Sequence, residues 1–268
     1  MSRYFRKYNY PRVQTKRICI YSKQLKREVI LDSYTPQISQ KPKDKLPIVL
    51  FNDGQVLSDM GISRILRKLL KAKMIQPCIL LGIHSNQNRH HELGTTQYLE
   101  ANGNGVLAQA YQEFIVKDLM AHLQVDHTDK IYIAGFSLGG LSALDIALNH
   151  PKRFDGVGVF SGALWWRDKS FTAKRPNAHL IIPKKIKALQ YIPQQRFWFQ
   201  AGTLDETSDR DKNGIIDVID DTLRTIMVLQ AKGVDKSNIS YVEIKGGKHH
   251  WSAWSKAMPK FLMTICGR

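Results

Sequence analysis

Apolar positions follow two different spacings along this chain. Short, densely apolar runs typical of buried strands recur at 48–51, 78–83, 131–134, 156–160, 196–200 and 239–244. Apolar residues at helical spacing recur at 62–73, 106–124, 138–148, 215–232 and 252–265. Strands that alternate with helices at these distances predict an α/β fold, with a mostly parallel central sheet and helices on both faces.

The N-terminal part of the chain has a different pattern. Strand-like segments at 17–21 and 28–34 flank a short polar turn, which predicts an antiparallel hairpin. A Pro- and Lys-rich loop at 36–47 follows the hairpin. Nothing later in the sequence has the composition of a linker, so we expect one domain over residues 1–268. Ligands of such sheets bind beyond the carboxyl ends of the strands.

One strand-to-helix turn carries the sequence Gly135-Phe-Ser137-Leu-Gly139. A serine with glycine two residues away on each side, between a strand and a helix, is the pattern of a nucleophile elbow. Small residues are needed there because the turn is too tight for larger side chains. The elbow would lift the Ser137 hydroxyl above the sheet edge, at a helix N-terminus whose free N–H groups suit a developing oxyanion.

A serine nucleophile needs a base that takes its proton and an acid that orients the base. In an elbow hydrolase the acid and then the histidine follow the serine along the chain. His249 and His250 follow the last predicted strand on a glycine-rich loop, and we favour His249 as the base, with His250 as the alternative. Asp205 ends the preceding strand and is the predicted acid, with Glu206 as the alternative; helix capping is the competing interpretation.

The tetrahedral intermediate of acyl transfer needs two N–H donors. One comes from the residue after the nucleophile, which is Leu138 here. The other comes from the loop after an early strand, and we expect it from the backbone N–H of Gln55 or Gly54. A simple tight turn is the alternative explanation for Gly54.

An acidic loop at 209–220 matches the pattern of a calcium-binding loop, with oxygen donors at alternating positions and a glycine at the sharp turn. Its predicted ligands are Asp209, Asp211, Asn213, Ile215 through its carbonyl, Asp217 and Asp220. The last position is Asp rather than the usual bidentate Glu, and no helix precedes the loop. Two interpretations remain. The loop could bind a structural calcium ion that stabilises the segment carrying Asp205, or it could be an acidic turn whose carboxylates stabilise the N-terminus of the next helix.

The composition is strongly basic, with 40 Lys and Arg against 23 Asp and Glu, a formal net charge of +17. The positive charges are scattered and form no basic helix or aromatic-interleaved tract, so we expect no nucleic-acid partner. They are compatible with an anionic small-molecule ester. No apolar run approaches the roughly 18 residues of a membrane span, and residues 1–8 lack the apolar core of a secretion signal. These features predict a cytoplasmic protein with no membrane partner.

Several short motifs occur in a characteristic order. They are Phe51-Asn-Asp-Gly-Gln55, Asn88-Arg-His-His-Glu-Leu-Gly94, Gly135-Phe-Ser-Leu-Gly-Gly140, Phe160-Ser-Gly162, Gly202-Thr-Leu-Asp205 and Gly246-Gly-Lys-His-His-Trp251. Together they resemble the putative-esterase family of α/β-hydrolases over about residues 15–265. That family includes enterochelin (ferric siderophore) esterases, feruloyl esterases, esterase D and mycolyltransferases.

The resemblance implies the α/β-hydrolase fold and selects His249 as the base. It also implies a substrate pocket built by Arg89, Glu92, Trp165, Trp166 and Trp251. The alternative for Arg89 and Glu92 is that they form an ion pair with each other that only stabilises a loop. For the two adjacent tryptophans it is ordinary core packing.

The sequence as a whole predicts a serine esterase that hydrolyses a carboxylic ester through Ser137, His249 and Asp205 and an acyl-enzyme intermediate. No cofactor is expected in catalysis. The resemblance favours a siderophore-esterase-like substrate. One alternative is an acyltransferase with the same chemistry and an acceptor other than water. Another is a non-catalytic protein of this fold that binds calcium or a polyanion.

Overall fold

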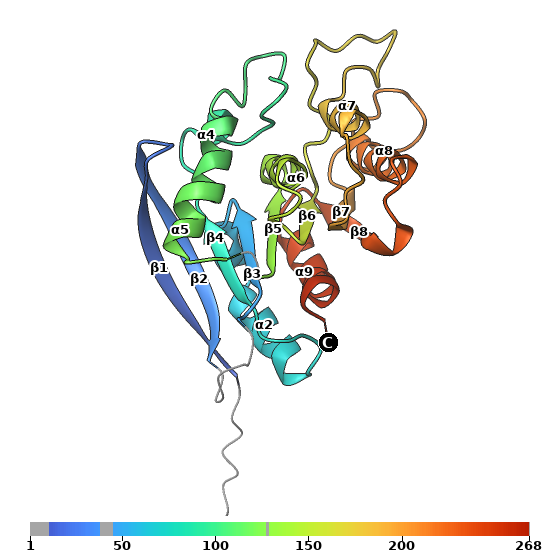
Figure 1. Cartoon of the computed structure of the whole chain (residues 1–268). Helices are drawn as coiled ribbons and strands as arrows, with labels where there is room; N and C mark the ends of the chain where they lie inside the picture. Colours follow the sequence, from blue (N-terminus) through green and yellow to red (C-terminus); the bar gives the residue numbers. More distant parts are fainter. Residues whose placement is uncertain (1–10, 38–44, 127–128, 268) are drawn as a thin grey trace, which may run out of the picture.

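The computed structural model describes residues 11–37, 45–126 and 129–267 (Figure 1). Residues 1–8 and most of the loop at 36–47 therefore lie outside the described part of the chain. The described strands are β1 (Arg12–Ser22), β2 (Arg27–Gln37), β3 (Ile48–Asn52), β4 (Ile79–Ile83), β5 (Ile131–Phe136), β6 (Gly156–Phe160), β7 (Arg196–Leu204) and β8 (Ile239–Lys248).

These strands form an eight-stranded sheet in the order β1-β2-β4-β3-β5-β6-β7-β8. β1 and β2 form the predicted antiparallel hairpin, which pairs with the sheet through β4. The remaining neighbours, from β4 to β8, all pair in parallel. Figure 1 shows the hairpin at one edge of the sheet and β7 and β8 at the other. The predicted α/β-hydrolase architecture is confirmed.

The helices follow the strands as the apolar spacing predicts, with some differences in detail. They are α1 (Val56–Asp59), α2 (Ile62–Lys71), α3 (Arg89–Glu92), α4 (Ala108–Glu113), α5 (Met120–His122), α6 (Leu138–Asn149), α7 (Ile181–Ala188), α8 (Asp217–Ala231) and α9 (Trp251–Cys266). A π-helical segment, η1 (Phe114–Leu119), joins α4 to α5, and a 3-10 turn, η2 (Lys236–Asn238), precedes β8. The helix predicted at 106–124 is therefore not one regular α-helix, and α7 was not predicted.

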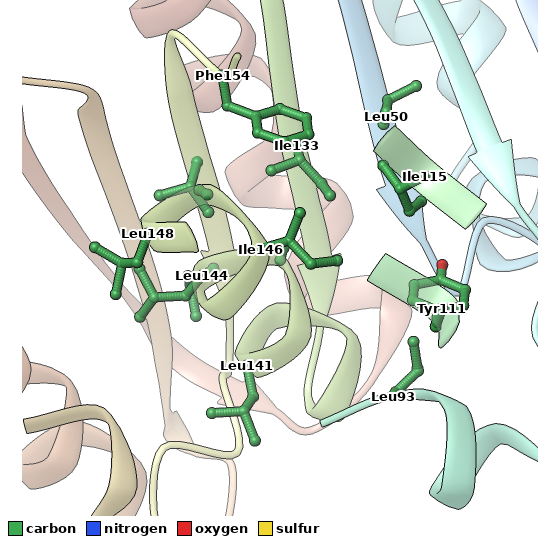
Figure 2. Packing of buried hydrophobic residues seen from close by; sticks show 14 of the residues in the cluster. Leu50, Leu93, Tyr111, Ile115, Ile133, Leu141, Leu144, Ile146, Leu148 and Phe154 are labelled. Atoms are coloured by element: carbon green, nitrogen blue, oxygen red, sulfur yellow. The ribbon is translucent and has the colours of Figure 1, made fainter. Parts of the chain in front are cut away.

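Each face of the sheet has its own apolar core. β3 shows the division, because its side chains alternate: Leu50 packs on one face, whereas Val49 and Phe51 pack on the other. α4, η1 and α6 cover the Leu50 face, and Figure 2 shows buried side chains of this core from α6 (Leu144 and Ile146), from β5 (Ile133) and from η1 (Ile115). α2 and α9 cover the opposite face. Burial on both sides explains why the parallel strands are almost wholly apolar.

The carboxyl ends of β5 and β6 rest on an aromatic cluster on the α9 face. The rings of Phe136 and Phe160 lie 5.2 Å apart, and Trp254 of α9 stacks on Phe136 at 4.8 Å. These contacts hold the first turns of α9 against the strand ends. The loop that precedes α9 is therefore anchored close to the turn after β5.

No helix within the described ranges is long and apolar enough to cross a bilayer.

Candidate active site

The turn after β5 has the strained geometry of an elbow. Ser137 has φ 54° and ψ −121°, which L-residues rarely adopt, and it immediately precedes α6. A Cβ on Gly135 would lie 2.3 Å from the backbone of Gly139, and one on Gly139 would lie 2.6 Å from Asp53 Oδ2. The Ser137 N–H donates to the Phe160 carbonyl at 2.8 Å, which ties the turn to the next strand. The tight turn predicted at Gly135-Phe-Ser137-Leu-Gly139 is confirmed.

Asp205 follows β7, and its carboxylate is fully buried and oriented by specific donors. Its Oδ2 accepts hydrogen bonds from Ser161 Oγ and from the Gly202 N–H, each at 2.7 Å. Ser161 Oγ in turn accepts from Trp254 Nε1 at 2.9 Å. The other oxygen of the same carboxylate, Asp205 Oδ1, lies 3.6 Å from His249 Nδ1. Within the described residues it has no hydrogen-bond partner. The carboxylate is thus locked on one side and directed at the imidazole on the other.

The two adjacent histidines point to different partners. His249 faces Asp205, and its ring packs edge-to-face on Trp254 at 5.5 Å. His250 is the N-cap of α9, where its Nδ1 accepts from the Ser252 N–H at 3.3 Å. Its ring lies beside that of Trp251 at 4.8 Å. Of the two candidate bases, the structure places only His249 next to the carboxylate.

A cavity of about 240 Å³ opens at this edge of the sheet. Ser137, His249 and Asp205 all line it, together with Ser161, Gly162, Ala163, Trp165, Glu206 and Val218. Residues that follow four different strands, β5, β6, β7 and β8, therefore meet at one cavity, as expected for a parallel sheet. Ser161 was missed by the sequence reasoning, although its position after a buried strand gave the same signal as Asp205.

Glu206 lines the cavity but faces α8 rather than the imidazole. Its Oε1 accepts from the Val218 N–H at 2.6 Å, in the first turn of α8. Burial raises the pKa of this carboxyl, and the nearby Asp217, Asp221 and Asp205 add to the effect. Glu206 thus resembles a helix cap in its contacts, whereas Asp205 is the carboxylate that faces a histidine.

The two candidates for the early-loop oxyanion donor differ in what their N–H groups do. The Gly54 N–H donates to the Ile83 carbonyl at 2.8 Å, so it is not available to a substrate. Gly54 is small because a Cβ would lie 2.1 Å from the Gly82 backbone. Gln55 is the N-cap residue of α1, which leaves its N–H as the candidate. Leu138 is the first residue of α6, where N–H groups have no intrahelical acceptor.

Arg89 and Glu92 do not pair with each other. Arg89 donates two hydrogen bonds of 2.7 Å to the carboxylate of Asp53 in the loop after β3. Glu92 is buried and accepts from Arg27 Nε at 2.7 Å. The Arg–Glu pair considered from the sequence is therefore absent. Arg89 instead fixes the loop that carries Gln55, because its partner Asp53 lies two residues before Gln55.

A second buried contact joins the same loop to the elbow. Asn52 Nδ2 donates to the Gly139 carbonyl at 2.9 Å, and Tyr111 of α4 donates its hydroxyl to Asn52 Oδ1 at 2.8 Å. Both side chains are buried. The two loops that would supply oxyanion donors are thus held at a constant separation. The sequence reasoning missed Asn52 and Tyr111, although a polar residue that ends an apolar strand is a usable signal.

The three tryptophans expected in the pocket have different environments. Trp165 lines the cavity and is 46% exposed. Trp166 is buried, and its ring packs over Gly94 and Gly105. Trp251 begins α9 beside His250, and it is not among the residues that line this cavity. The structure therefore brings Trp165 to the cavity and places Trp166 in the core.

The acidic loop is closed by its own backbone donors. Asp209 accepts from the N–H groups of Asn213 and Gly214 at 3.1 and 2.9 Å. Asn213 Oδ1 accepts from the Ile215 N–H at 2.8 Å. Two of the oxygen-bearing side chains predicted as ligands thus accept hydrogen bonds within the turn. These contacts are those of an Asx-type turn that leads into α8.

The other predicted ligands contact cations and amides of the protein. Asp211 accepts from Asn177 Nδ2 at 2.7 Å, and Asp217 and Asp220 form ion pairs with Arg210 and Arg224. Within residues 11–37, 45–126 and 129–267, no group of three or more His, Cys, Asp or Glu side chains is arranged to hold a metal. Most of the predicted ligand side chains are thus engaged by other groups of the protein in this structure, and calcium binding stays a prediction.

The mostly parallel sheet, the strained serine after β5 and the carboxylate and histidine after β7 and β8 define an α/β-hydrolase. The chain belongs to the family described as Putative esterase, whose model matches residues 22–265.

The similar proteins found by comparison are also described as esterases. The chain is 27% identical over 159 residues to the iron(III) enterobactin esterase of Escherichia coli (strain K12), which covers 58% of this chain and 38% of that protein. It is similar to the enterobactin esterase FES from Shigella flexneri in the presence of enterobactin, with a TM-score of 0.73 and 20% identity over 96% of this chain and 61% of that one. It is also similar to a ferulic acid esterase, with a TM-score of 0.71 and 15% identity over 96% and 98% of the two chains. The chain thus spans less than half the length of the curated relative.

Proposed function

We propose that this chain is a carboxylic ester hydrolase that uses Ser137 as nucleophile, His249 as base and Asp205 as the orienting acid. The observation that carries the proposal is the shared cavity, which all three side chains line. Membership of the esterase family supports the reaction class. The strained backbone at Ser137 supports the choice of nucleophile, because such strain persists only where the surrounding structure enforces it.

Acylation begins when Ser137 Oγ attacks the ester carbonyl and its proton passes to His249. Because His249 Nδ1 faces Asp205 Oδ1, the other ring nitrogen, Nε2, is the one that takes the proton. The Nδ1–Oδ1 separation of 3.6 Å is longer than a hydrogen bond, and we expect it to shorten when the imidazolium forms. Buried Asp205 then stabilises the positive ring without itself being protonated.

The oxyanion of the tetrahedral intermediate would accept hydrogen bonds from the N–H groups of Leu138 and Gln55. Donors that are already in place need no reorganisation as negative charge develops, and each contributes roughly 3 kcal/mol in comparable sites. Asn52, Tyr111 and Arg89 support this arrangement because they fix the Gln55 loop against the elbow.

The intermediate collapses as the imidazolium gives its proton to the leaving alcohol, which leaves an acyl ester on Ser137 Oγ. A water molecule then attacks that ester and gives its proton to His249. The imidazolium returns the proton to Ser137 Oγ as the acid product leaves. Each step is carried by side chains and backbone groups of this chain and by water.

For the substrate, we infer a siderophore-like ester. The iron(III) enterobactin esterase of Escherichia coli and the Shigella flexneri structure with enterobactin support this choice. The net charge of +17 is compatible with an anionic substrate. Purified protein would be assayed on enterobactin, feruloyl esters and simple acyl esters in parallel. The highest kcat/KM on enterobactin is expected, and a clear preference for feruloyl or acyl esters would refute the substrate assignment alone.

The reaction class is tested with p-nitrophenyl acetate. Ser137→Ala is expected to reduce hydrolysis by several orders of magnitude. Ser142→Ala, which removes another α6 serine hydroxyl away from the cavity, is the matched control and is expected to keep the activity. Hydrolysis that survives Ser137→Ala unchanged would contradict the proposal.

A further inference from the structure

A second and larger cavity, of about 710 Å³, lies on the α2 side of the sheet. Its walls come from β1 and β2, from the loop after β3, from the first turns of α2 and from the residue after β4. Arg17, Arg64, Arg67 and His84 line it, and among the described lining residues Asp32 is the one with a carboxylate. The cavity is therefore predominantly cationic.

The Asp32 carboxylate is already paired with Arg17 and in contact with His84. Arg17 donates to both oxygens of Asp32 at 2.8 and 3.0 Å, and His84 Nε2 lies 2.8 Å from Asp32 Oδ2. These contacts, led by the Arg17 hydrogen bond, lower the pKa of Asp32, so its carboxylate stays ionised and paired. The other two arginines, Arg64 and Arg67, supply positive charge that Asp32 does not balance.

Arg64 and Arg67 lie one turn apart on α2, and both are exposed. No ion pair of either arginine with a carboxylate is found within the described residues. The start of α2 adds to the positive potential, because Ser63 also lines the cavity and the first N–H groups of a helix carry partial positive charge. Guanidinium groups bind carboxylate and other oxyanions through paired N–H donors.

The cavity adjoins the oxyanion loop through Gln55. The Gln55 side chain lines the cavity and holds Ser85 by two hydrogen bonds, Nε2 to Ser85 Oγ at 2.8 Å and Ser85 N–H to Oε1 at 3.2 Å. The backbone N–H of the same residue is the proposed oxyanion donor. A substrate whose carbonyl oxygen accepts from that N–H would therefore have one arm within reach of this cavity.

We propose that the Arg64–Arg67 cavity binds an anionic oxygen group on one arm of the ester substrate, a carboxylate or a phenolate separated from the reacting carbonyl by a flexible spacer. The inference rests on the proposed function and adds a specificity site to it. The bound anion would sit outside the small cavity at Ser137, whose described lining includes the carboxyl groups of Asp205 and Glu206 and no Lys or Arg.

The test compares anionic and neutral esters of matched length. On the acyl side, the p-nitrophenyl half-ester of suberic acid is paired with p-nitrophenyl octanoate. On the alcohol side, the acetate ester of ω-hydroxyoctanoic acid is paired with octyl acetate. The quantity measured is the ratio of kcat/KM between the anionic and the neutral member of each pair, for the wild-type chain and for the double variant Arg64→Ala/Arg67→Ala.

In at least one pair the double variant is expected to lower this ratio on the order of tenfold, mainly through KM, and added salt is expected to lower it in the wild type. Lys68→Ala removes an exposed α2 cation that does not line the cavity, and it should leave both ratios unchanged. Ratios that the double variant leaves unchanged in both pairs would overturn the inference. Absence of Ser137-dependent hydrolysis of the neutral esters would instead refute the proposed function.

Discussion

Removal of the Ser161 hydroxyl would test how the candidate acid is held. In the structure this hydroxyl donates to Asp205 Oδ2 at 2.7 Å and accepts from Trp254 Nε1 at 2.9 Å, and all three groups are buried. Ser161→Ala leaves one carboxylate oxygen with a single donor and the indole N–H with none. A hydrogen bond to a charged group contributes about 1.5–3 kcal/mol and a neutral one about 1 kcal/mol, so we expect a loss of about 2–4 kcal/mol in the free energy of unfolding.

The same change should slow catalysis, because Asp205 could rotate and His249 would lose its fixed orientation. We expect kcat on p-nitrophenyl acetate to fall on the order of tenfold to a hundredfold, with a small change in KM. Urea unfolding and steady-state kinetics measure the two effects. Thr264→Ala, which removes an exposed hydroxyl that donates to the Lys260 carbonyl, is the control. A Ser161→Ala protein with wild-type stability and wild-type kcat would refute this reasoning.

Three further changes have outcomes that the structure predicts. His250→Ala removes the side-chain cap of α9, so we expect the free energy of unfolding, measured in urea, to fall by about 1 kcal/mol while ester hydrolysis persists. A loss of activity as large as that of His249→Ala would contradict this expectation. Gly139→Ala would place a Cβ 2.6 Å from the Asp53 carboxylate, which Arg89 holds in place by two hydrogen bonds. We therefore expect the free energy of unfolding to fall by about 1–3 kcal/mol and kcat to decrease. A variant with unchanged thermal unfolding and kinetics would contradict the elbow geometry. Burial raises the pKa of Glu206, so the folded chain holds the Glu206 proton more tightly than the unfolded chain does. Stability therefore falls as the pH rises from 4.5, the ordinary pKa of a glutamate, through the raised pKa of the folded chain. Glu206→Gln should therefore be more stable than the wild type at neutral pH, with the difference shrinking in acid; unfolding curves measured across this range would show no such convergence if the assignment is wrong.

The sheet could be predicted from the sequence because each parallel strand is buried on both faces and is therefore densely apolar. The runs at 131–134 and 156–160 are found within β5 and β6. Strand ends were less predictable: β8 continues from the expected end at 244 to Lys248, on a Gly-rich extension that pairs with β7 across an irregularity. Backbone pairing there does not depend on an apolar side-chain pattern, so the pattern gave no signal.

α7 shows a different limit. Its segment contains Pro183 and two adjacent lysines, which weakens a helical pattern. One of these, Lys185, is almost completely buried and forms an ion pair with Asp145 of α6, and burial lowers the pKa of the lysine. A sequence pattern counts lysine as exposed, because the carboxylate that permits its burial lies 40 residues away along the chain.

The candidate site was predictable where a motif sets the backbone, as at Ser137, and where a polar residue follows a buried strand, as at Asp205. His249 was favoured over His250 by the family resemblance, whereas position along the chain left both open, since adjacent side chains diverge and the packing of α9 decides which one faces the carboxylate. The contacts of Asn52, Tyr111 and Ser161 join elements that are distant in sequence, so no local pattern contains them.

The proposed mechanism makes Ser137 the nucleophile that becomes covalently acylated. It is tested most directly by brief treatment with a fluorophosphonate probe, followed by digestion and mass spectrometry of the labelled peptide. One adduct is expected, on the Ser137 hydroxyl, which is lost in Ser137→Ala and strongly reduced in His249→Ala. Labelling of a different residue, or unlabelled protein that still hydrolyses esters, would contradict it.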